Sequence, residues 1–203
     1  MNDRGWPLVR CIAHGRAPIG LGMGRVKGIA ILDAVKFLRA RRDDALETLP
    51  APMHHYLDDQ IGTSMWYPEG DLVELIRGVA KLLPGPIDRA LMMMGERSAR
   101  AQTVVYGDLI RGIQSNSRTF ALWSTQHDTG EMRSQMESPS RVRVELAGFE
   151  DTSREFCLLL GGYLAGTLAV NGITDGSIQK LSCRLWGDSI CAWRGSWSPL
   201  DEK

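Results

Sequence analysis

The 203-residue chain lacks a charge excess, because its 24 Lys and Arg residues balance 24 Asp and Glu residues. A neutral chain has no electrostatic reason to bind nucleic acid or an anionic membrane surface, so we expect neither partner. The chain also lacks any run of about 18 apolar residues, so no membrane span is predicted. Its polar start, MNDRGWPLVR, is unlike a signal peptide. We therefore expect a cytoplasmic protein, in which near-neutrality slightly favours self-association.

Cysteine is scarce, with four residues, and in the cytoplasm these are better interpreted as thiols or ligands than as disulfides. Cys157 lies in an apolar stretch that predicts a helix. Cys183 and Cys191 flank the Gly-Asp pair at 187–188, which is typical of a hairpin turn. A three-residue loop at 186–188 would place both sulfurs on one face, whereas a two-residue turn would place them on opposite faces. Three converging thiols would form a metal site, a redox site or a small dense core.

Motifs for catalysis are also missing. The chain shows no Ser-His-Asp order, no nucleophile elbow and no paired carboxylates with a supporting base. Gly20, Gly22 and Gly24 match neither the dinucleotide fingerprint nor the P-loop. His54 and His55 follow Pro52 in a predicted short helix or turn, so we interpret them as a solvent-exposed pair and not as a metal site. We therefore expect a protein that is not an enzyme.

Helical periodicity is present over most of the chain before residue 128. Residues 1–24 carry Gly and Pro with little periodicity, which predicts a tail, an extended arm or an edge strand. Pro50 and Pro52 end the first helix, and Pro68 suits the start of another. The apolar spacing predicts helices over about 29–48, 53–60, 68–83, 87–113 with a break near Gly95 or Gly107, and 118–127.

The pattern changes after residue 130. A strand is expected from near Glu131, and RVRVEL at 141–146 alternates with period two. Thr152 or Ser153 can cap a helix that runs to about Val170, and the remainder alternates again on both sides of the turn at 187–188. Helices followed by two hairpins flanking one helix predict an α+β fold, with an antiparallel sheet packed on a helical N-terminal half.

These residues carry a resemblance. The C-terminal pattern of Cys157, Gly162-Tyr163-x-x-Gly166, Cys183 and Cys191 resembles the four-vinyl-reductase-type ligand-binding domain. A closer resemblance is to uncharacterised single-domain myxobacterial relatives of that domain, and it covers roughly residues 25–197. The landmarks of this closer resemblance are VKG at 26–28, WYP at 66–68, LW at 122–123, DTG at 128–130 and GF at 148–149.

The resemblance implies a fold and a kind of function. The superfamily includes haem-nitric-oxide-binding domains and trafficking adaptors, with an antiparallel sheet against helices, and its members are often dimers. Several of them bind hydrophobic small molecules in a buried cavity. We therefore expect an N-terminal arm over residues 1–24 and a single domain over residues 25–200.

The resemblance also bears on cofactors. In the aromatic-sensing regulators of the superfamily, three Cys and one Glu hold a structural zinc, and the three Cys fall on Cys157, Cys183 and Cys191. Lys180 stands at the position of the Glu. Glu155, Asp188 or a His would have to supply the fourth ligand; otherwise the thiols are small buried side chains. None of the four His lies in the Tyr-x-Ser-x-Arg setting of haem-binding relatives. We expect no cofactor other than this candidate structural zinc.

The leading hypothesis is a non-catalytic regulatory domain, a homodimer that binds a small hydrophobic molecule and acts through a protein partner. One alternative is a dimeric interaction adaptor without a ligand. Another is an enzyme that reduces a tetrapyrrole vinyl group, as the family name implies. Ligand pockets favour aromatic side chains around a few polar groups. The candidate pocket residues are Trp66, Tyr67, Tyr106, Phe120, Trp123 and Tyr163.

Overall fold

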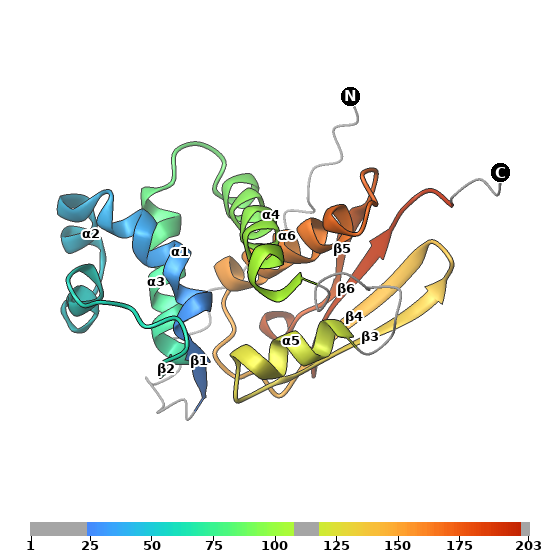
Figure 1. Ribbon diagram of the computed structural model, residues 1–203, viewed down its shortest axis with the longest axis horizontal. Helices are drawn as coiled ribbons and strands as arrows, with labels where there is room; N and C mark the ends of the chain where they lie inside the picture. Colours follow the sequence, from blue (N-terminus) through green and yellow to red (C-terminus); the bar gives the residue numbers. More distant parts are fainter. Residues whose placement is uncertain (1–23, 108–117, 200–203) are drawn as a thin grey trace.

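The computed structural model describes residues 24–107 and 118–199 (Figure 1). A helical half comes first and a sheet-containing half follows, so the α+β expectation is confirmed. The first half contains β1 (Arg25–Lys27), α1 (Gly28–Arg39), α2 (Arg42–Thr48), the 3-10 helix η1 (Ala51–Leu57), β2 (Trp66–Pro68), α3 (Glu69–Leu82) and α4 (Ile87–Tyr106). The second half contains α5 (Arg118–Gln126), β3 (Glu131–Ser138), β4 (Arg141–Ala147), α6 (Arg154–Val170), β5 (Ser177–Ser182), the 3-10 helix η3 (Arg184–Trp186) and β6 (Cys191–Ser196).

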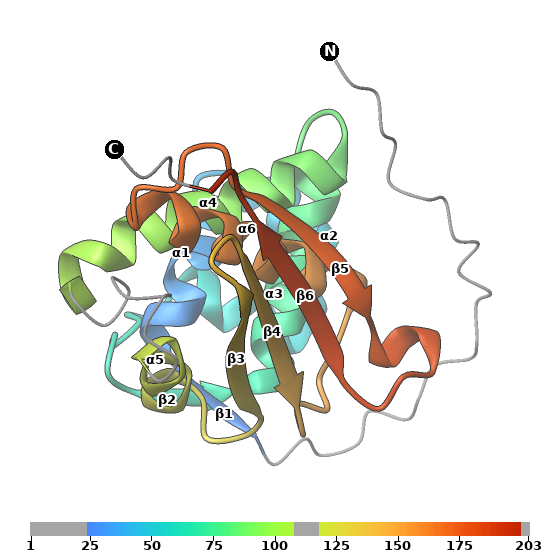
Figure 2. The ribbon, with the colours of Figure 1, turned by 90° about the vertical axis from the view of Figure 1, so that its right-hand side faces the viewer.

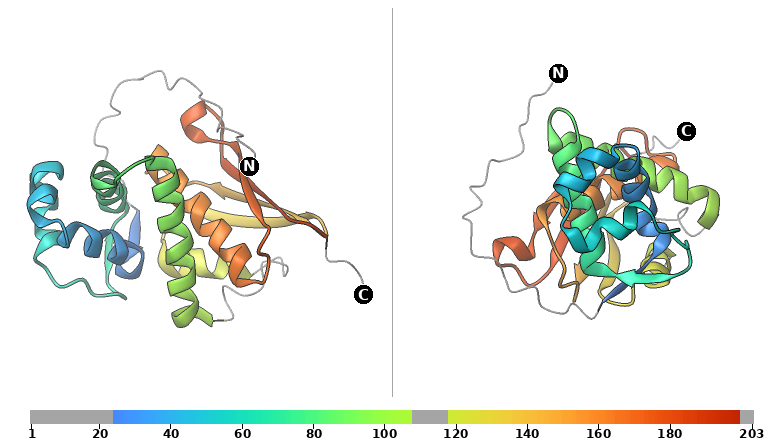
Figure 3. Two further views of the ribbon diagram at one scale, coloured as in Figure 1. Left: turned by 90° about the horizontal axis from the view of Figure 1, so that it is seen from above. Right: turned by 90° about the vertical axis from the view of Figure 1, so that its left-hand side faces the viewer.

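Strands β3 to β6 form one antiparallel sheet in the order β3-β4-β6-β5 (Figure 2). The two predicted hairpins therefore share a sheet, joined by the pairing of Val144 on β4 with Trp193 on β6. Helix α6 covers one face of this sheet, and α4 packs on the far side of α6. Seen from above in Figure 3, α4 and α6 lie between the sheet and the helices α1 to α3.

Helix α6 is apolar on all sides because it is enclosed by α4 and the sheet. Ser153 caps it by accepting a hydrogen bond from the backbone N–H of Phe156 at 3.0 Å, which settles the choice between Thr152 and Ser153. A Cβ on Gly162 would lie 2.0 Å from the carbonyl oxygen of Met92. A Cβ on Gly166 would lie 2.7 Å from that of Glu96, so these glycines let α6 approach α4.

Two local features differ from what the sequence predicts. The first predicted helix breaks at Ala40 and Arg41 into α1 and α2, although neither Gly nor Pro marks the break. Arg39 donates to the carbonyl oxygen of Tyr56 at 2.8 Å, so a contact with η1 stabilises the end of α1. The segment 66–68 pairs with 25–27 as a small second sheet that periodicity over so few residues cannot reveal.

The remaining helix boundaries agree more closely with the sequence. Helix α4 ends before Gly107, whose φ of 40° suits a glycine, and residues 108–113 of the predicted helix lie outside the described residues. Residues 1–23 of the expected N-terminal arm also lie outside them. Among the described helices, none has the length and apolar character that crossing a membrane requires.

In the Tyr56→Phe variant, we expect the free energy of unfolding to decrease less steeply as the pH rises into the alkaline range. Tyr56 is buried and donates to Asp71 Oδ2 at 2.7 Å. Burial has the larger effect and the hydrogen bond the smaller one, and both raise the pKa of Tyr56. In the unfolded chain the phenol ionises above its ordinary pKa of about 10, whereas in the folded chain it stays neutral. The contribution of Tyr56 to stability is therefore fully present below that pH and is lost as the pH rises. Urea unfolding of both proteins between about pH 8 and pH 11 measures the slope. An unchanged slope in Y56F would contradict this assignment.

Candidate functional site

A cavity of about 80 Å³ lies where the two halves of the chain meet. Helices α1 and α3 line it from the first half together with α4, and α5, β3 and α6 line it from the second. Most of the lining is apolar, which favours a small uncharged occupant. The lining residues are Ile29, Ala30, Asp33, Leu72, Ser98, Gln102, Leu122, Trp123, Gln126, His127, Met132, Phe156, Leu159, Leu160, Tyr163 and Leu164.

Polar side chains in the lining bind one another across helices. Gln102 Oε1 accepts hydrogen bonds from the Tyr163 hydroxyl at 2.9 Å and from Gln126 Nε2 at 3.2 Å. Burial, with a smaller effect of Tyr106, raises the pKa of Tyr163, so its hydroxyl stays protonated and donates. On the other side of the cavity, Ser98 Oγ donates to Asp33 Oδ2 at 2.8 Å. These contacts connect α4 to α1, α5 and α6.

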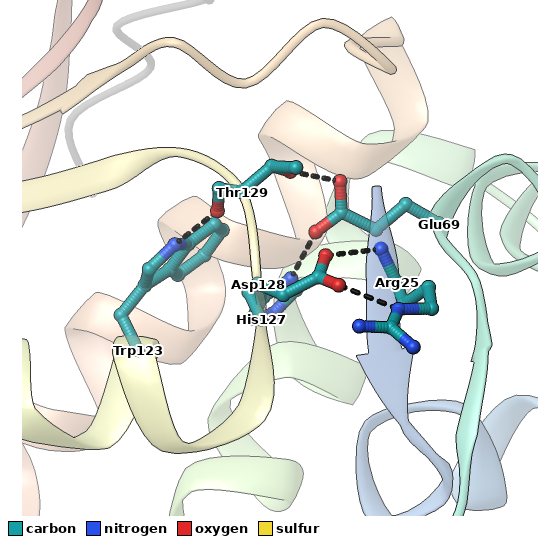
Figure 4. A network of polar contacts seen from close by, with 6 residues as sticks. All are labelled: Arg25, Glu69, Trp123, His127, Asp128 and Thr129. Atoms are coloured by element: carbon teal, nitrogen blue, oxygen red, sulfur yellow. Dashed lines mark hydrogen bonds and ion pairs between the residues drawn. The ribbon is translucent and has the colours of Figure 1, made fainter. Parts of the chain in front are cut away.

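The most buried polar contact of the site is the hydrogen bond between His127 and Glu69 (Figure 4). Glu69 starts α3, His127 follows α5, and Glu69 Oε1 lies 2.9 Å from His127 Nδ1. The other oxygen, Oε2, accepts the hydroxyl of Thr129. The imidazole stacks on the indole of Trp123 at 3.8 Å between centroids, and Phe149 meets both rings edge-on. The ring of His127 is therefore held in both position and orientation.

An ion pair joins the same two segments at the surface. Asp128 Oδ2 accepts from Arg25 Nε at 2.7 Å, and Asp128 Oδ1 accepts the backbone N–H of Arg25 (Figure 4). Burial raises the pKa of Asp128, but the hydrogen bonds from Arg25 together outweigh it and the pKa is lowered. The backbone also bridges Val26 and His127. Strand β1 is thus attached to the segment that follows α5.

The predicted pocket residues divide into two groups. Trp123 and Tyr163 line the cavity. Trp66 is exposed beside the side chains of Arg25 and Lys27, and Tyr67 Oη accepts from the backbone of Gly62, so neither of these two lines it. Tyr106 also lies outside the lining, and the side chain of Phe120 is not among the described ones. The roles predicted for these residues stay predictions.

The three cysteines do converge, although not through the tight hairpin turn that we considered. Residues 183–190 form a longer loop containing η3, and Gly187 with a φ of 93° ends that helix. Cys183 Sγ lies 3.8 Å from Cys157 Sγ and 3.9 Å from Cys191 Sγ. Hydrogen bonds with the other two thiols raise the pKa of Cys157 and lower that of Cys191. The three thiols therefore form one coupled group.

Lys180 supplies a positive charge to this thiol cluster. Its Nζ donates to Cys157 Sγ at 3.5 Å and lies 3.3 Å from the ring centroid of Trp193. The other candidate ligands are engaged elsewhere. Asp188 Oδ2 accepts the backbone N–H of Cys183 at 2.8 Å, and Glu155 lies 3.9 Å from Arg77. Within the described residues, the group of side chains close enough to share a metal contains the three thiols alone.

Comparison of the chain with known proteins connects it to solved structures and to nothing else. No protein-family model matches it, and no curated protein matches it in sequence. A structure solved for a study of haem distortion in the H-NOX family matches at a TM-score of 0.61 and 12% identity, over 87% of this chain and 98% of that one. The fold is that of H-NOX domains.

Two further H-NOX structures support this assignment of the fold. An H-NOX protein from S. oneidensis in the Fe(II)NO ligation state matches at a TM-score of 0.55 and 15% identity, over 85% of this chain and 99% of that one. An oxygen-binding H-NOX domain related to soluble guanylate cyclases matches at 0.58 and 12%, over 87% and 98%. The fold agrees with the one that the resemblance implied, whereas the four-vinyl-reductase resemblance itself stays a prediction.

The cofactor expectation is contradicted. We expected none other than a structural zinc on Cys157, Cys183 and Cys191, yet the structures that share the fold include haem domains. Haem needs an axial ligand and a large pocket. His127 is the histidine in the cavity lining, and the cavity of about 80 Å³ is far below the roughly 300–1,000 Å³ of ordinary ligand pockets. As packed, the residues of this chain do not fit haem.

Sequence reasoning missed the central residues of the site. Glu69 and His127 are 58 positions apart, so no motif spacing could connect them. The nearest signal was DTG at 128–130, which contains Thr129, and which we used only as a landmark of the resemblance. A buried carboxylate is rarely left without a partner, but burial of Glu69 follows from the tertiary packing and not from its neighbours in sequence.

Proposed function

We propose that the chain is a non-catalytic sensory domain that binds a small hydrophobic molecule in this cavity and acts through a protein partner. The observation that carries the proposal is the position of the cavity. Its walls come from both halves of the chain, so an occupant contacts α1 and α3 on one side and α5 and α6 on the other. A ligand that contacts both sides binds one arrangement of the halves better than another, which shifts their equilibrium.

The fold supports the proposal by analogy. The H-NOX structures that match this chain come from studies of haem distortion and of activation, and they include an Fe(II)NO state and an oxygen complex. Domains of this architecture are therefore able to hold a ligand. In our proposal the present chain keeps the architecture and binds a smaller molecule between its halves. The four-vinyl-reductase resemblance points the same way, because several members of that superfamily bind hydrophobic compounds.

Filling the cavity tests the function. Ala30 lines it from α1, so Ala30→Phe is expected to occupy its volume and to abolish stabilisation by any ligand. Ala101, on the exposed side of α4, provides the matched control Ala101→Phe. Thermal unfolding is measured for both variants and the native protein against small aromatic, aliphatic and lipid compounds, with native mass spectrometry of any hit. Absence of any stabilised complex of the native protein, or equal stabilisation of A30F, would contradict the function.

The adaptor alternative has one observation of its own. The end of α4 exposes Val104 and Val105, and Met93 is exposed earlier on the same helix. Exposed apolar side chains on one element are typical of an interaction site. The predicted homodimer would use such a surface, and light scattering coupled to size-exclusion chromatography gives the oligomeric state. A dimer that forms without any bound compound, together with a failed A30F experiment, would favour the adaptor.

A further inference from the structure

One side-chain nitrogen of the cavity lining, Nε2 of His127, makes no hydrogen bond to the described residues. The side chain of His127 is 7% exposed and lines the cavity. Its Nδ1 is bound to Glu69, whereas no hydrogen bond of its Nε2 is found among the described residues. A nitrogen in this position is available to water or to an occupant of the cavity, and a few such polar groups usually orient the ligand in small-molecule pockets. The chemistry of Nε2 therefore indicates what the cavity binds.

Glu69 determines the chemistry of that nitrogen. An ionised carboxylate only accepts hydrogen bonds, so the proton of a neutral imidazole must lie on Nδ1, where it is donated to Glu69 Oε1 at 2.9 Å. Nε2 then carries a lone pair and acts as an acceptor. Thr129 holds the other oxygen of Glu69, and Trp123 stacks on the ring, so neither partner can easily turn away.

The other polar atoms of the lining are less suited to the same task. Gln102 Oε1 already accepts two hydrogen bonds, from Tyr163 and Gln126. Asp33 is half-buried and accepts the hydroxyl of Ser98. An anionic ligand is disfavoured, because it would bring a second negative charge near Glu69 into an apolar surrounding. The ligand that suits this lining is therefore a neutral molecule that donates one hydrogen bond.

We propose that the ligand is a small neutral molecule with an apolar body and one hydrogen-bond donor, such as a short alcohol, and that His127 Nε2 accepts its proton donor while Glu69 acts as the positioning residue. This inference rests on the proposed function and adds the class of ligand. The cavity of about 80 Å³ agrees with a molecule of a few heavy atoms, because a cavity of about 150 Å³ holds benzene.

The test compares 2-butanol with butanone, which have the same carbon skeleton, while only the alcohol donates a hydrogen bond. Binding to the native protein is followed by chemical-shift titration of the ¹⁵N-labelled chain. We expect the alcohol to bind about three- to tenfold more tightly, the usual difference made by one hydrogen bond. The alcohol should also move the His127 Nε2 resonance in the direction of a lone pair that gains a hydrogen bond, and butanone should not.

Two variants separate recognition from packing. His127→Phe keeps a ring against Trp123 and removes Nε2, so the preference for the alcohol should disappear. Glu69→Gln keeps the shape and allows the proton of the imidazole on either nitrogen, so the ratio of the two affinities should fall towards one. The native-protein spectrum and E69Q carry the test if H127F does not fold. A preference for the alcohol that is unchanged in E69Q overturns the role of Glu69.

The outcomes also separate this inference from the function on which it rests. Equal binding of 2-butanol and butanone, both abolished in A30F, overturns the inference and leaves the proposed function standing. Binding of neither compound, while larger apolar compounds stabilise the native protein but not A30F, likewise overturns the inference alone. Failure of every compound overturns both. Tighter binding of the alcohol, with the Nε2 response and the loss in E69Q, supports both.

Discussion

Replacing Gly162 with alanine is expected to lower the free energy of unfolding by about 3 kcal/mol, the upper end of the cost of overpacking a core. The added Cβ would lie 2.0 Å from the carbonyl oxygen of Met92 and 2.6 Å from its carbonyl carbon. Both are backbone atoms of α4, so no side-chain rotation relieves the clash and the two helices must separate. For a chain of this length the melting temperature should fall by roughly 6–12 °C.

The neighbouring glycine supplies the control. A Cβ on Gly161 would meet Trp193 Nε1 at 3.5 Å, an ordinary contact, because this residue faces the sheet. Gly161→Ala should leave stability unchanged or raise it by up to about 1 kcal/mol, the difference in helix propensity. Thermal and urea unfolding of both variants make the comparison. Equal stability of G161A and G162A would show that α4 and α6 are not in close contact.

The same comparison shows what the sequence could reveal about the fold. The apolar run and the Ser153 cap predicted α6, and alternation predicted β3 and β4, because those signals act within one element. Neither signal identifies the neighbour of a glycine. Gly162 and Gly166 face α4, whereas Gly161 faces the sheet, and nothing in their sequence neighbours distinguishes them. Which helix lies opposite is a property of the tertiary packing.

The site was less accessible to sequence analysis for a related reason. The cysteines attracted attention because their spacing is recognisable, and they do meet, with Lys180 at Cys157 in place of a carboxylate. Trp123 and Tyr163 were foreseen as aromatic residues and line the cavity. The polar centre, Glu69 with His127, joins two segments that neither motif nor periodicity connects. A single sequence therefore indicates the composition of a cavity more readily than its hydrogen bonds.

Replacing Glu69 with alanine is expected to lower the free energy of unfolding by about 2–6 kcal/mol, because two buried donors lose their acceptor at about 1–3 kcal/mol each. Glu69 is 1% exposed, so water cannot replace the carboxylate. His127 Nδ1 and the Thr129 hydroxyl would both lose the oxygen to which they are bound. Glu69→Gln retains an oxygen and a nitrogen at those positions and should be considerably more stable than E69A.

Because the same residues join the two halves, the loss should extend beyond α3. Asp128 and Arg25 lie on the segments that flank this pair, so hydrogen exchange in E69A should increase in β1 and in the turn after α5 before it increases in β5 and β6. Glu131→Ala is the control, because its partner Arg133 is exposed and the pair is screened by water, so no measurable change is expected. Uniform exchange throughout E69A, or stability equal to that of E131A, would show that the pair does not hold the halves together.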